Sequence, residues 1–422
     1  MKGIALLWAL AAPALAAFLL LRGGVGSASG VAEFSAEEVE RILRHSPLGP
    51  PPADPTNAFA EHPGAAALGQ RLFFDVRLSR SGKIACATCH DPARGLADGE
   101  ALSSRFPLDR HVPSLWNAAY QRWYFWDGRA DSLWSQALKP LENPDEHGWS
   151  RLEAAQLLRG DGRLRTSYET VFGPLPDFSD ARRFPPAGGP LADPEGARVW
   201  AAMRAEDREE VDRVFARLGK SIAAFGRRLV SRRAPFDVFV EGLRDGDAGK
   251  LAALSPEARR GLKLFMGRGN CRLCHVGPAF TDGEFHDLGL IPAKGLPGPG
   301  RHAGIRGLRG DPFNGSGPHS DARAEGARKL EFLSDLPETW GQFKTPSLRN
   351  VARTAPYMHQ GQFATLRDVV RFYSTLRPSF RAGHQESGVL APLRLDGDEI
   401  DALVAFLESL SDADPALPRP PD

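Results

Sequence analysis

The amino-acid sequence predicts a mainly α-helical protein with two tandem units and long loops. A pentapeptide of the form Cys-x-x-Cys-His occurs twice, and each copy follows a segment with helical spacing of apolar residues. The segments on both sides of the pentapeptide repeat as well, which indicates an internal duplication. No segment shows convincing strand alternation, so helices are expected to form most of the regular structure.

The repeated segments begin with the helices that precede the pentapeptides. The first helix is expected over residues 65–74, and the second follows Ser255, an N-cap residue with proline next to it. Gly69–Phe73 and Gly261–Phe265 share the pattern Gly-x-x-Leu-Phe. After each pentapeptide the repeat continues to Ala97–Gly99 and Thr281–Gly283.

Both pentapeptides match the attachment signal for c-type haem, in which two thiols bond to the haem vinyl groups and the adjoining His binds the iron. The four cysteines of the chain are the four that these motifs contain. A zinc half-site or a redox dithiol would also use a Cys pair, but a His directly after both pairs favours haem. We expect two covalently bound haems, held by Cys86, Cys89 and His90 and by Cys271, Cys274 and His275.

Charge and the first residues limit the function classes. The 422 residues include 53 Lys and Arg and 52 Asp and Glu, so no global basic field favours nucleic acid. Lys2, an apolar run from Gly3 to Leu21 and a small-residue stretch resemble a secretory signal peptide, with an uncleaved membrane anchor as the alternative. Both interpretations put the globular part in the periplasm, where c-type haem is normally attached in bacteria.

The chain divides into four predicted parts: a signal peptide or anchor (1–30), a first haem domain (31–206), a second haem domain (207–412) and a loose Pro-rich tail (413–422). An amphipathic helix over 207–230 is expected to bridge the two halves. A helix starting near Asp396 is expected to close the second domain. The Pro- and Gly-rich segments 173–196 and 291–328 are expected to be loops.

Three further blocks of sequence carry a family resemblance. They are Phe125–Arg129 with Gln136 and Glu146 after it, Lys344–Asn350, and Ala355–Gly361 followed by Leu366–Tyr373. Together with the haem motifs, these blocks resemble the bacterial di-haem cytochrome c peroxidase and MauG family. The resemblance covers nearly the whole chain after about residue 60. It implies an oxidoreductase with hydrogen peroxide as acceptor.

By that resemblance the haem on His90 is the peroxidatic one, and Gln136 and Glu146 are the distal pair. Cleavage of a peroxide bond requires a base that takes a proton from one oxygen and returns it to the other. A carboxylate can do this, whereas an amide can only orient the peroxide. Glu146 is therefore the predicted acid–base group and Gln136 the orienting group. Trp126 matches the family's tryptophan between the two haems, where an indole can relay an electron; a core aromatic is the alternative role.

The haem on His275 is the expected site of electron arrival, and its sixth ligand differs within the family. The ligand is a methionine in the peroxidases and a tyrosine in MauG, and the matching residue here is Tyr373. Tyr373 shares one helical face with the apolar residues of its segment, so its ring is expected to point inward. Met358 is the rival ligand, and a core tyrosine is the alternative role of Tyr373.

Two features depart from the peroxidase pattern. No histidine lies between His90 and Arg110, so the histidine that caps the peroxidatic iron in resting peroxidases is missing, as in MauG. The resemblance also implies a calcium ion between the haems, held by an asparagine side chain and the carbonyls of Thr354 and Pro356. His111 stands at the asparagine position, and imidazole is a poor ligand for calcium, which makes calcium doubtful.

Three functions remain in competition. The first is a periplasmic di-haem peroxidase that reduces hydrogen peroxide with electrons from a cytochrome c, a cupredoxin or another donor. The second is a MauG-like maturase that oxidises residues of a partner protein. The third is a non-enzymatic di-haem electron carrier, which would have no use for Gln136 and Glu146. No nucleic-acid partner is expected. Membrane contact is expected only through a retained N-terminal anchor.

Overall fold

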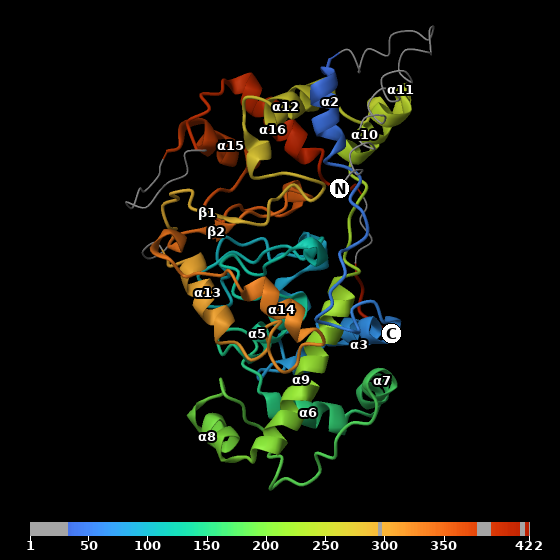
Figure 1. The fold of residues 1–422 in the computed structure, drawn as a ribbon, viewed down its shortest axis with the longest axis vertical. Coiled ribbons are helices and arrows are strands. Elements are labelled where there is room, and N and C mark those ends of the chain that lie inside the picture. The colour runs from blue at the N-terminus through green and yellow to red at the C-terminus, as the bar shows by residue number, and fades with distance from the viewer. Residues whose placement is uncertain (1–32, 294–297, 378–389, 414–417, 422) are drawn as a thin grey trace, which may run out of the picture.

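The computed structural model describes residues 33–293, 298–377, 390–413 and 418–421. Over these ranges the chain forms an elongated, mainly helical molecule with one unit at each end of the long axis (Figure 1). None of the helices in these ranges has both the length and the apolar character that a membrane crossing requires. The predicted signal or anchor (1–30) and part of the predicted tail lie outside the described residues.

The first unit occupies the lower part of Figure 1. Its helices are α3 (Pro63–Phe74), α4 (Cys86–Cys89), α5 (Leu133–Glu142), α6 (Arg151–Gly160), α7 (Gly162–Phe172), α8 (Pro194–Ala202) and α9 (Ala205–Gly226), with short 3₁₀ turns η1 (Val76–Leu78), η2 (Pro92–Arg94) and η3 (Ala118–Tyr120). The predicted loop 173–196 is a loop over residues 173–193, and its last three residues begin α8. The loop inserts Phe178 and Phe184 into the core.

The second unit occupies the upper part of Figure 1. Its helices are α2 (Ala36–Leu43), α10 (Pro235–Asp245), α11 (Ala248–Leu251), α12 (Pro256–Met266), α15 (Leu366–Thr375) and α16 (Gly397–Glu408), with turns η4 (Cys271–Leu273) and η6 (Val351–Arg353). Ser255 caps α12 and Asp396 caps α16, which confirms both predicted helix starts. Although α2 comes first in the chain, it packs on α10 and α12.

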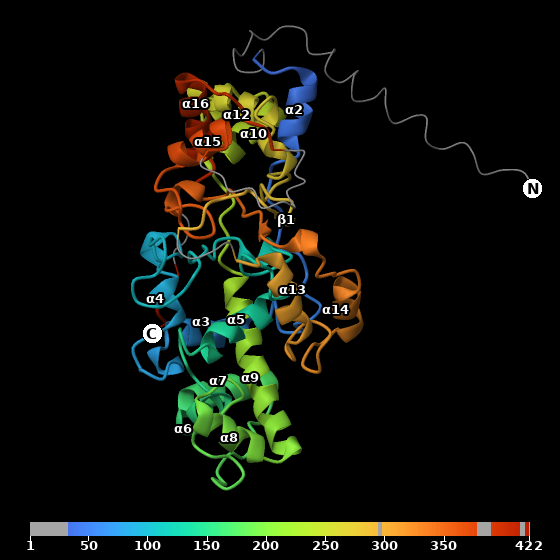
Figure 2. The same cartoon turned by 90° about the vertical axis from the view of Figure 1, so that its left-hand side faces the viewer.

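A long excursion of the second half reaches back to the first unit. It contains the two-residue strands β1 (Phe285–His286) and β2 (Phe343–Lys344), which pair antiparallel, and α13 (Arg301–Arg309), α14 (Arg323–Leu330) and turn η5 (Pro337–Thr339). The expectation of a polar loop over 291–328 was therefore wrong. Among the described residues of this segment, the buried apolar side chains of substantial size are Ile305, Leu308 and Phe313. The segment after α13 reaches α5, where Asp311 pairs with Lys139 at 2.5 Å. Figure 2 shows α13 and α14 on one side of the first unit.

Each unit is closed by a pair of crossing helices. In the first unit α9 packs on α3, and in the second α16 packs on α12. Both crossings depend on a glycine, because a Cβ atom on Gly69 or Gly261 would overlap a backbone carbonyl, that of Ser221 or Ala402. The repeated Gly-x-x-Leu-Phe pattern thus marks the same helix contact in both units.

The position of α9 bears on the predicted boundary between residues 206 and 207. The helix packs on α3, α5 and α6, and its apolar face is part of the core of the first unit. It contacts the second half through Phe313, whose ring lies 5.8 Å from Phe215, and through the Lys220–Asp321 ion pair at 2.8 Å. A division after α9 agrees better with this packing than one before it.

The duplication extends beyond the segments that the sequence analysis compared. Asn117 and Asn350, which are 233 residues apart, both adopt the left-handed conformation before a 3₁₀ turn. The same spacing relates the bridges Tyr124–Ala130 and Tyr357–Phe363, and the N-caps of α5 and α15. Residues 113–142 and 346–375 are therefore structural equivalents, and the excursion with α13 and α14 is an insertion before the second copy.

Candidate functional site

Both motif histidines are oriented by the same kind of contact. The His90 Nδ1 atom lies 3.0 Å from the Leu96 carbonyl, and the His275 Nδ1 atom lies 2.9 Å from the Phe280 carbonyl. Because a carbonyl only accepts, each Nδ1 carries the proton, and Nε2 keeps its lone pair. Burial lowers the pKa of His90 to about 4, and it also lowers the pKa of His275. Both rings are neutral near pH 7, as iron ligation requires.

The surroundings of the motifs fit a haem group. In the second unit Cys271, Cys274 and His275 line a cavity of about 280 Å³, together with apolar residues of α15 and α16. In the first unit Cys86 packs against an apolar cluster that includes Phe73 and Trp116. Burial raises the pKa of Cys86 and of Cys271 to about 12, so these thiols stay protonated near pH 7.

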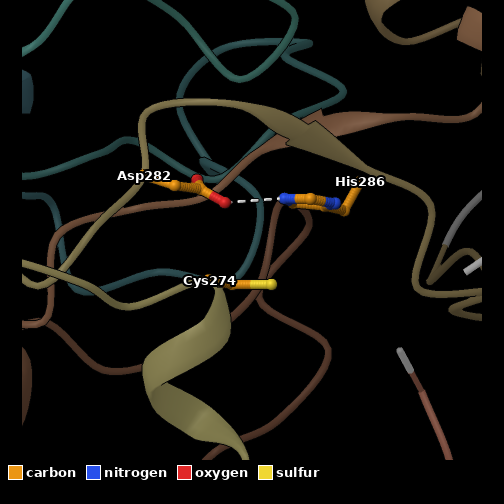
Figure 3. A group of neighbouring side chains, drawn as sticks. All are labelled: Cys274, Asp282 and His286. Atoms are coloured by element: carbon orange, nitrogen blue, oxygen red, sulfur yellow. Dashed lines mark hydrogen bonds and ion pairs between the residues drawn. The ribbon is translucent and has the colours of Figure 1, made fainter.

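A second cluster of metal-type ligands adjoins the second motif (Figure 3). Its His286 Nε2 atom lies 2.8 Å from Asp282 Oδ2, and the three ligand atoms, with the Cys274 sulfur, lie within 4.8 Å of one another. A thioether bond to haem would consume the Cys274 thiol, and a two-residue site remains. The Asp282 carboxylate is the largest cause of the raised pKa of His286, followed by the Cys274 sulfur, so His286 and Asp282 form an ion pair near pH 7.

Glu146 lies close to the first motif. Its negative charge contributes to the raised pKa of Cys86 and of Cys89. The Asn143 side chain donates a hydrogen bond of 2.6 Å to Glu146 Oε1, which fixes the carboxylate. Burial raises the pKa of Glu146, against the opposing effects of Asn143 and Arg129. Gln136, the other predicted distal residue, is half-buried on α5.

Trp126 lies at the junction of the two units. Its indole Nε1 donates to the His111 carbonyl at 2.8 Å, and its ring contacts the His359 ring with a centroid separation of 6.5 Å. Its own carbonyl accepts from the Lys344 backbone N–H at 2.8 Å. Trp126 comes from the first unit but lines the cavity of the second motif.

Both predicted candidates for the second iron ligand face the same cavity. Tyr373 lines it from α15, and Met358 lines it from the turn before α15. Burial raises the pKa of Tyr373. In the first unit the equivalent positions, 233 residues earlier, are Pro140 and Phe125, and neither of these side chains can ligate iron.

Some residues at these sites were missed in the sequence analysis. Asn143 and Arg129 act on Glu146, and Lys344 and His359 lie at the junction with Trp126. The spacing of 233 residues was the available signal, because it aligns His359 with Trp126 and Lys344 with His111.

Two helical units, each with a half-buried His after a Cys pair, define a di-haem cytochrome of the c type with an enzyme-like carboxylate beside one motif. Residues 63–245 match the family described as di-haem cytochrome c peroxidase. The chain is 32% identical over 409 residues to the methylamine utilization protein MauG of Methylorubrum extorquens, covering 94% of this chain and 92% of that protein. It therefore belongs to the di-haem cytochrome c peroxidase and MauG family, whose cofactors are haems.

Other relatives agree with this assignment. The chain is 34% identical to the cytochrome-c peroxidase IdrP2 of Pseudomonas sp. (strain SCT), covering 86% of this chain and 85% of that protein. Among solved structures, the diheme peroxidase BthA from Burkholderia thailandensis is 26% identical, with a TM-score of 0.57 over 87% of this chain and 93% of that one. A MauG-like protein associated with microbial copper homeostasis is 25% identical, with a TM-score of 0.59, over 87% of this chain and 94% of that one. The chain is an oxidoreductase of the peroxidase type.

Proposed function

We propose that this protein is a periplasmic peroxidase that reduces hydrogen peroxide at the first motif with electrons received at the second from a small redox protein. The observation that carries the proposal is the half-buried carboxylate of Glu146, held by Asn143 and close enough to Cys86 and Cys89 to raise the pKa of both thiols. A pure electron carrier needs no such group, because shielding both irons serves it better. Family membership supports the same choice.

The chain offers a complete set of groups for two covalent haems. Cys86 and Cys89, and Cys271 and Cys274, would form the thioethers, and the Nε2 atoms of His90 and His275 would bind the irons. When bound, haem supplies the redox-active iron through which two electrons and two protons convert hydrogen peroxide to two water molecules.

Glu146 moves the protons in this reaction. Its carboxylate accepts a proton from one oxygen of the bound peroxide and returns it to the departing oxygen. The hydrogen bond from Asn143 leaves Oε2 as the atom that exchanges the proton. Gln136, with a side-chain amide of no useful basicity, orients the peroxide or its water.

The differences between the equivalent helices α5 and α15 support this division of labour. Position 136 is a glutamine in the first unit, whereas its equivalent in the second is Val369. Pro140 likewise stands where the second unit has Tyr373. The first unit therefore offers a polar pocket without a side-chain ligand on this helix, and the second offers a ligand and an apolar wall.

A second candidate function is the oxidation of residues of a partner protein, as in the MauG branch. The position of Tyr373 in the second cavity favours it. A phenolate is a hard anionic donor that stabilises ferric iron, whereas a thioether favours ferrous iron. Tyr373 ligation would suit removal of electrons from a partner better than uptake from a high-potential donor.

Exchange of Glu146 for Gln tests the proposed function. Loss of one acid–base group slows turnover by roughly 10²–10⁴-fold, so peroxide reduction in Glu146→Gln should fall by that factor while both haem spectra stay unchanged. Asp145→Asn is the matched control, because this neighbouring carboxylate is exposed and should keep wild-type turnover. Near-normal turnover in Glu146→Gln would remove Glu146 from the mechanism.

A further inference from the structure

His111 links the two units through backbone oxygens of both. The side chain is 4% exposed, and its Nδ1 atom lies 2.7 Å from the Glu100 carbonyl of the first unit. The Thr354 carbonyl of the second unit is a further acceptor for the ring. Burial lowers the pKa of His111, and the two carbonyls oppose that shift. One imidazole thus lies between acceptors from both halves of the chain.

A carboxylate adds a third oxygen group to this environment. Asp98 acts on His111 electrostatically, and its Oδ2 atom is buried without a hydrogen-bond partner among the described residues. Two carbonyls and a carboxylate are the ligand types that a hard divalent cation prefers. An imidazole is not one of these ligand types. The His111 ring therefore occupies a position whose surrounding oxygen groups suit a cation.

The equivalent position in the second unit holds a second basic side chain. Lys344 corresponds to His111, and Asp282 corresponds to Asp98 in the repeated motif. Burial lowers the pKa of Lys344, the Asp282 carboxylate partly opposes this shift, and the net pKa is about 8. The backbone contacts are reciprocal as well, because His111 N–H donates to the His359 carbonyl at 2.9 Å and Lys344 N–H donates to the Trp126 carbonyl at 2.8 Å. Both sides of the junction therefore pair a buried basic residue with an aspartate.

We propose that the His111 side chain fills an oxygen-lined site between the two units in place of a divalent cation, and that His111 is a positioning residue for Trp126. The second part follows from the His111 carbonyl, which accepts from the Trp126 indole at 2.8 Å. Because carbonyls of both units hold the His111 ring, the His111 backbone carbonyl is fixed in one orientation. The Trp126 indole that donates to this carbonyl is therefore fixed as well. Only the relay role of Trp126 rests on the proposed function; the cation replacement does not.

The first test compares calcium binding in the holoprotein and in His111→Asn. The wild type should contain no calcium after gel filtration in calcium buffer, and its Tm should be the same with calcium and with the chelator EGTA. In His111→Asn the smaller amide adds an oxygen and vacates the ring volume. It should therefore retain about one calcium per chain, and calcium should raise its Tm by at least about 2 °C.

The second test concerns Trp126. Peroxide turnover of His111→Asn should fall in EGTA and recover with calcium, at constant haem content, because the cation takes over the positioning of the junction. A merely structural role of His111 would give no recovery by calcium. His302→Asn, a histidine outside the junction on α13, is the matched control and should respond to neither reagent.

Two results would overturn the proposal. One is a wild-type protein that holds stoichiometric calcium and loses thermal stability in EGTA, because the oxygen groups would then bind a cation beside His111. The other is a His111→Asn protein that carries both haems but binds no calcium. Metal content and Tm require no peroxide turnover, so a failure of the proposed function would not be confused with either result.

Discussion

Glu146 shows how one side chain is prepared for proton transfer by its surroundings. Water is largely excluded from the carboxylate, which favours its neutral form, while Asn143 donates to the charged form. The net direction is a raised pKa, which brings the group closer to neutral pH. A solvated glutamate would be a weaker base for the same step.

The raised pKa of Glu146 predicts an acidic limb in the pH dependence of peroxide turnover. The group must begin as a carboxylate, so turnover should fall as the pH decreases through a pKa above the ordinary 4.5. Steady-state rates between about pH 4 and 8 would measure this limb, because catalytic glutamates with raised pKa values titrate within about that range. In Glu146→Gln the limb should disappear from the residual activity, whereas an unchanged limb would assign it to another group.

Tyr373 and Met358 compete for one iron, and their chemistry separates them. If Tyr373 is the ligand, Tyr373→Phe should raise the reduction potential of the second haem and change its absorption spectrum, because a hard anionic donor is lost. Met358→Leu should leave both unchanged. Spectroelectrochemical titration of the two variants decides the matter. A sulfur-to-iron charge-transfer band that vanishes in Met358→Leu would identify the thioether instead.

At the scale of elements, the two units depend on crossing helices whose contact leaves no room for a side chain. A Cβ on Gly69 would lie 1.9 Å from the Ser221 carbonyl oxygen, and a Cβ on Gly261 would lie 1.9 Å from that of Ala402. Backbone carbonyls in helices cannot move away without breaking their own hydrogen bonds. The helices must therefore separate when either glycine is replaced.

Gly69→Ala is expected to destabilise the first unit by about 1–3 kcal/mol, the usual cost of overpacking, or more. Gly160→Ala is the matched control, because Gly160 lies in helix α6 with nothing near its hypothetical Cβ. Alanine there should be neutral or stabilising, by up to about 1 kcal/mol. Chemical denaturation of the two holoproteins measures the difference. Equal stability of Gly69→Ala and the wild type would contradict the close crossing.

The elements that could be predicted from the sequence are those with a strong apolar period or a clear cap. The helix capped by Ser255 and the helix capped by Asp396 begin where predicted. Helices α13 and α14 were missed because they are rich in arginine and bury few residues, so their pattern is that of a polar loop. Their partners lie outside the helices themselves: Lys329 of α14 donates to the Asp131 carbonyl nearly two hundred residues away. Arg306 and Arg309 of α13 pair with Asp335, further along the excursion.

In the candidate site, too, some residues could be predicted from the sequence and others could not. Motif residues such as His90 were predictable because their chemistry is encoded in five consecutive residues. The role of Lys344 was not, because it depends on which chain segments meet at the junction. The hydrogen bond from Asn143 to Glu146 spans only three residues, but a spacing of three in a turn does not by itself show that the two side chains meet. Periodicity reports which face of a helix is buried, but it does not report what that face contacts.

At the scale of the whole molecule, the duplication produced two similar structural frameworks whose side chains differ. The shared framework is visible in residues 113–142 and 346–375, with the same turns and the same caps. The divergence is concentrated on α5 and α15, where Pro140 stands opposite Tyr373. At this helix position the first unit therefore carries a residue that cannot ligate iron, whereas the second carries a tyrosine that could. One open and one ligated haem is the asymmetry that a peroxidase with an internal electron donor requires.

This asymmetry predicts that the first haem is open in the resting protein. Pro140 and Phe125 cannot ligate iron, and the segment between His90 and Arg110 contains no histidine that could cap it. Electron paramagnetic resonance of the diferric protein as purified should therefore show one high-spin and one low-spin haem. Peroxide should change the absorption spectrum without prior half-reduction, whereas a capped site would first need an electron to release its ligand. Two low-spin signals, with no response to peroxide, would mean that another side chain closes the first site, and Gln136→Ala and Glu146→Gln spectra would show whether a distal residue does so.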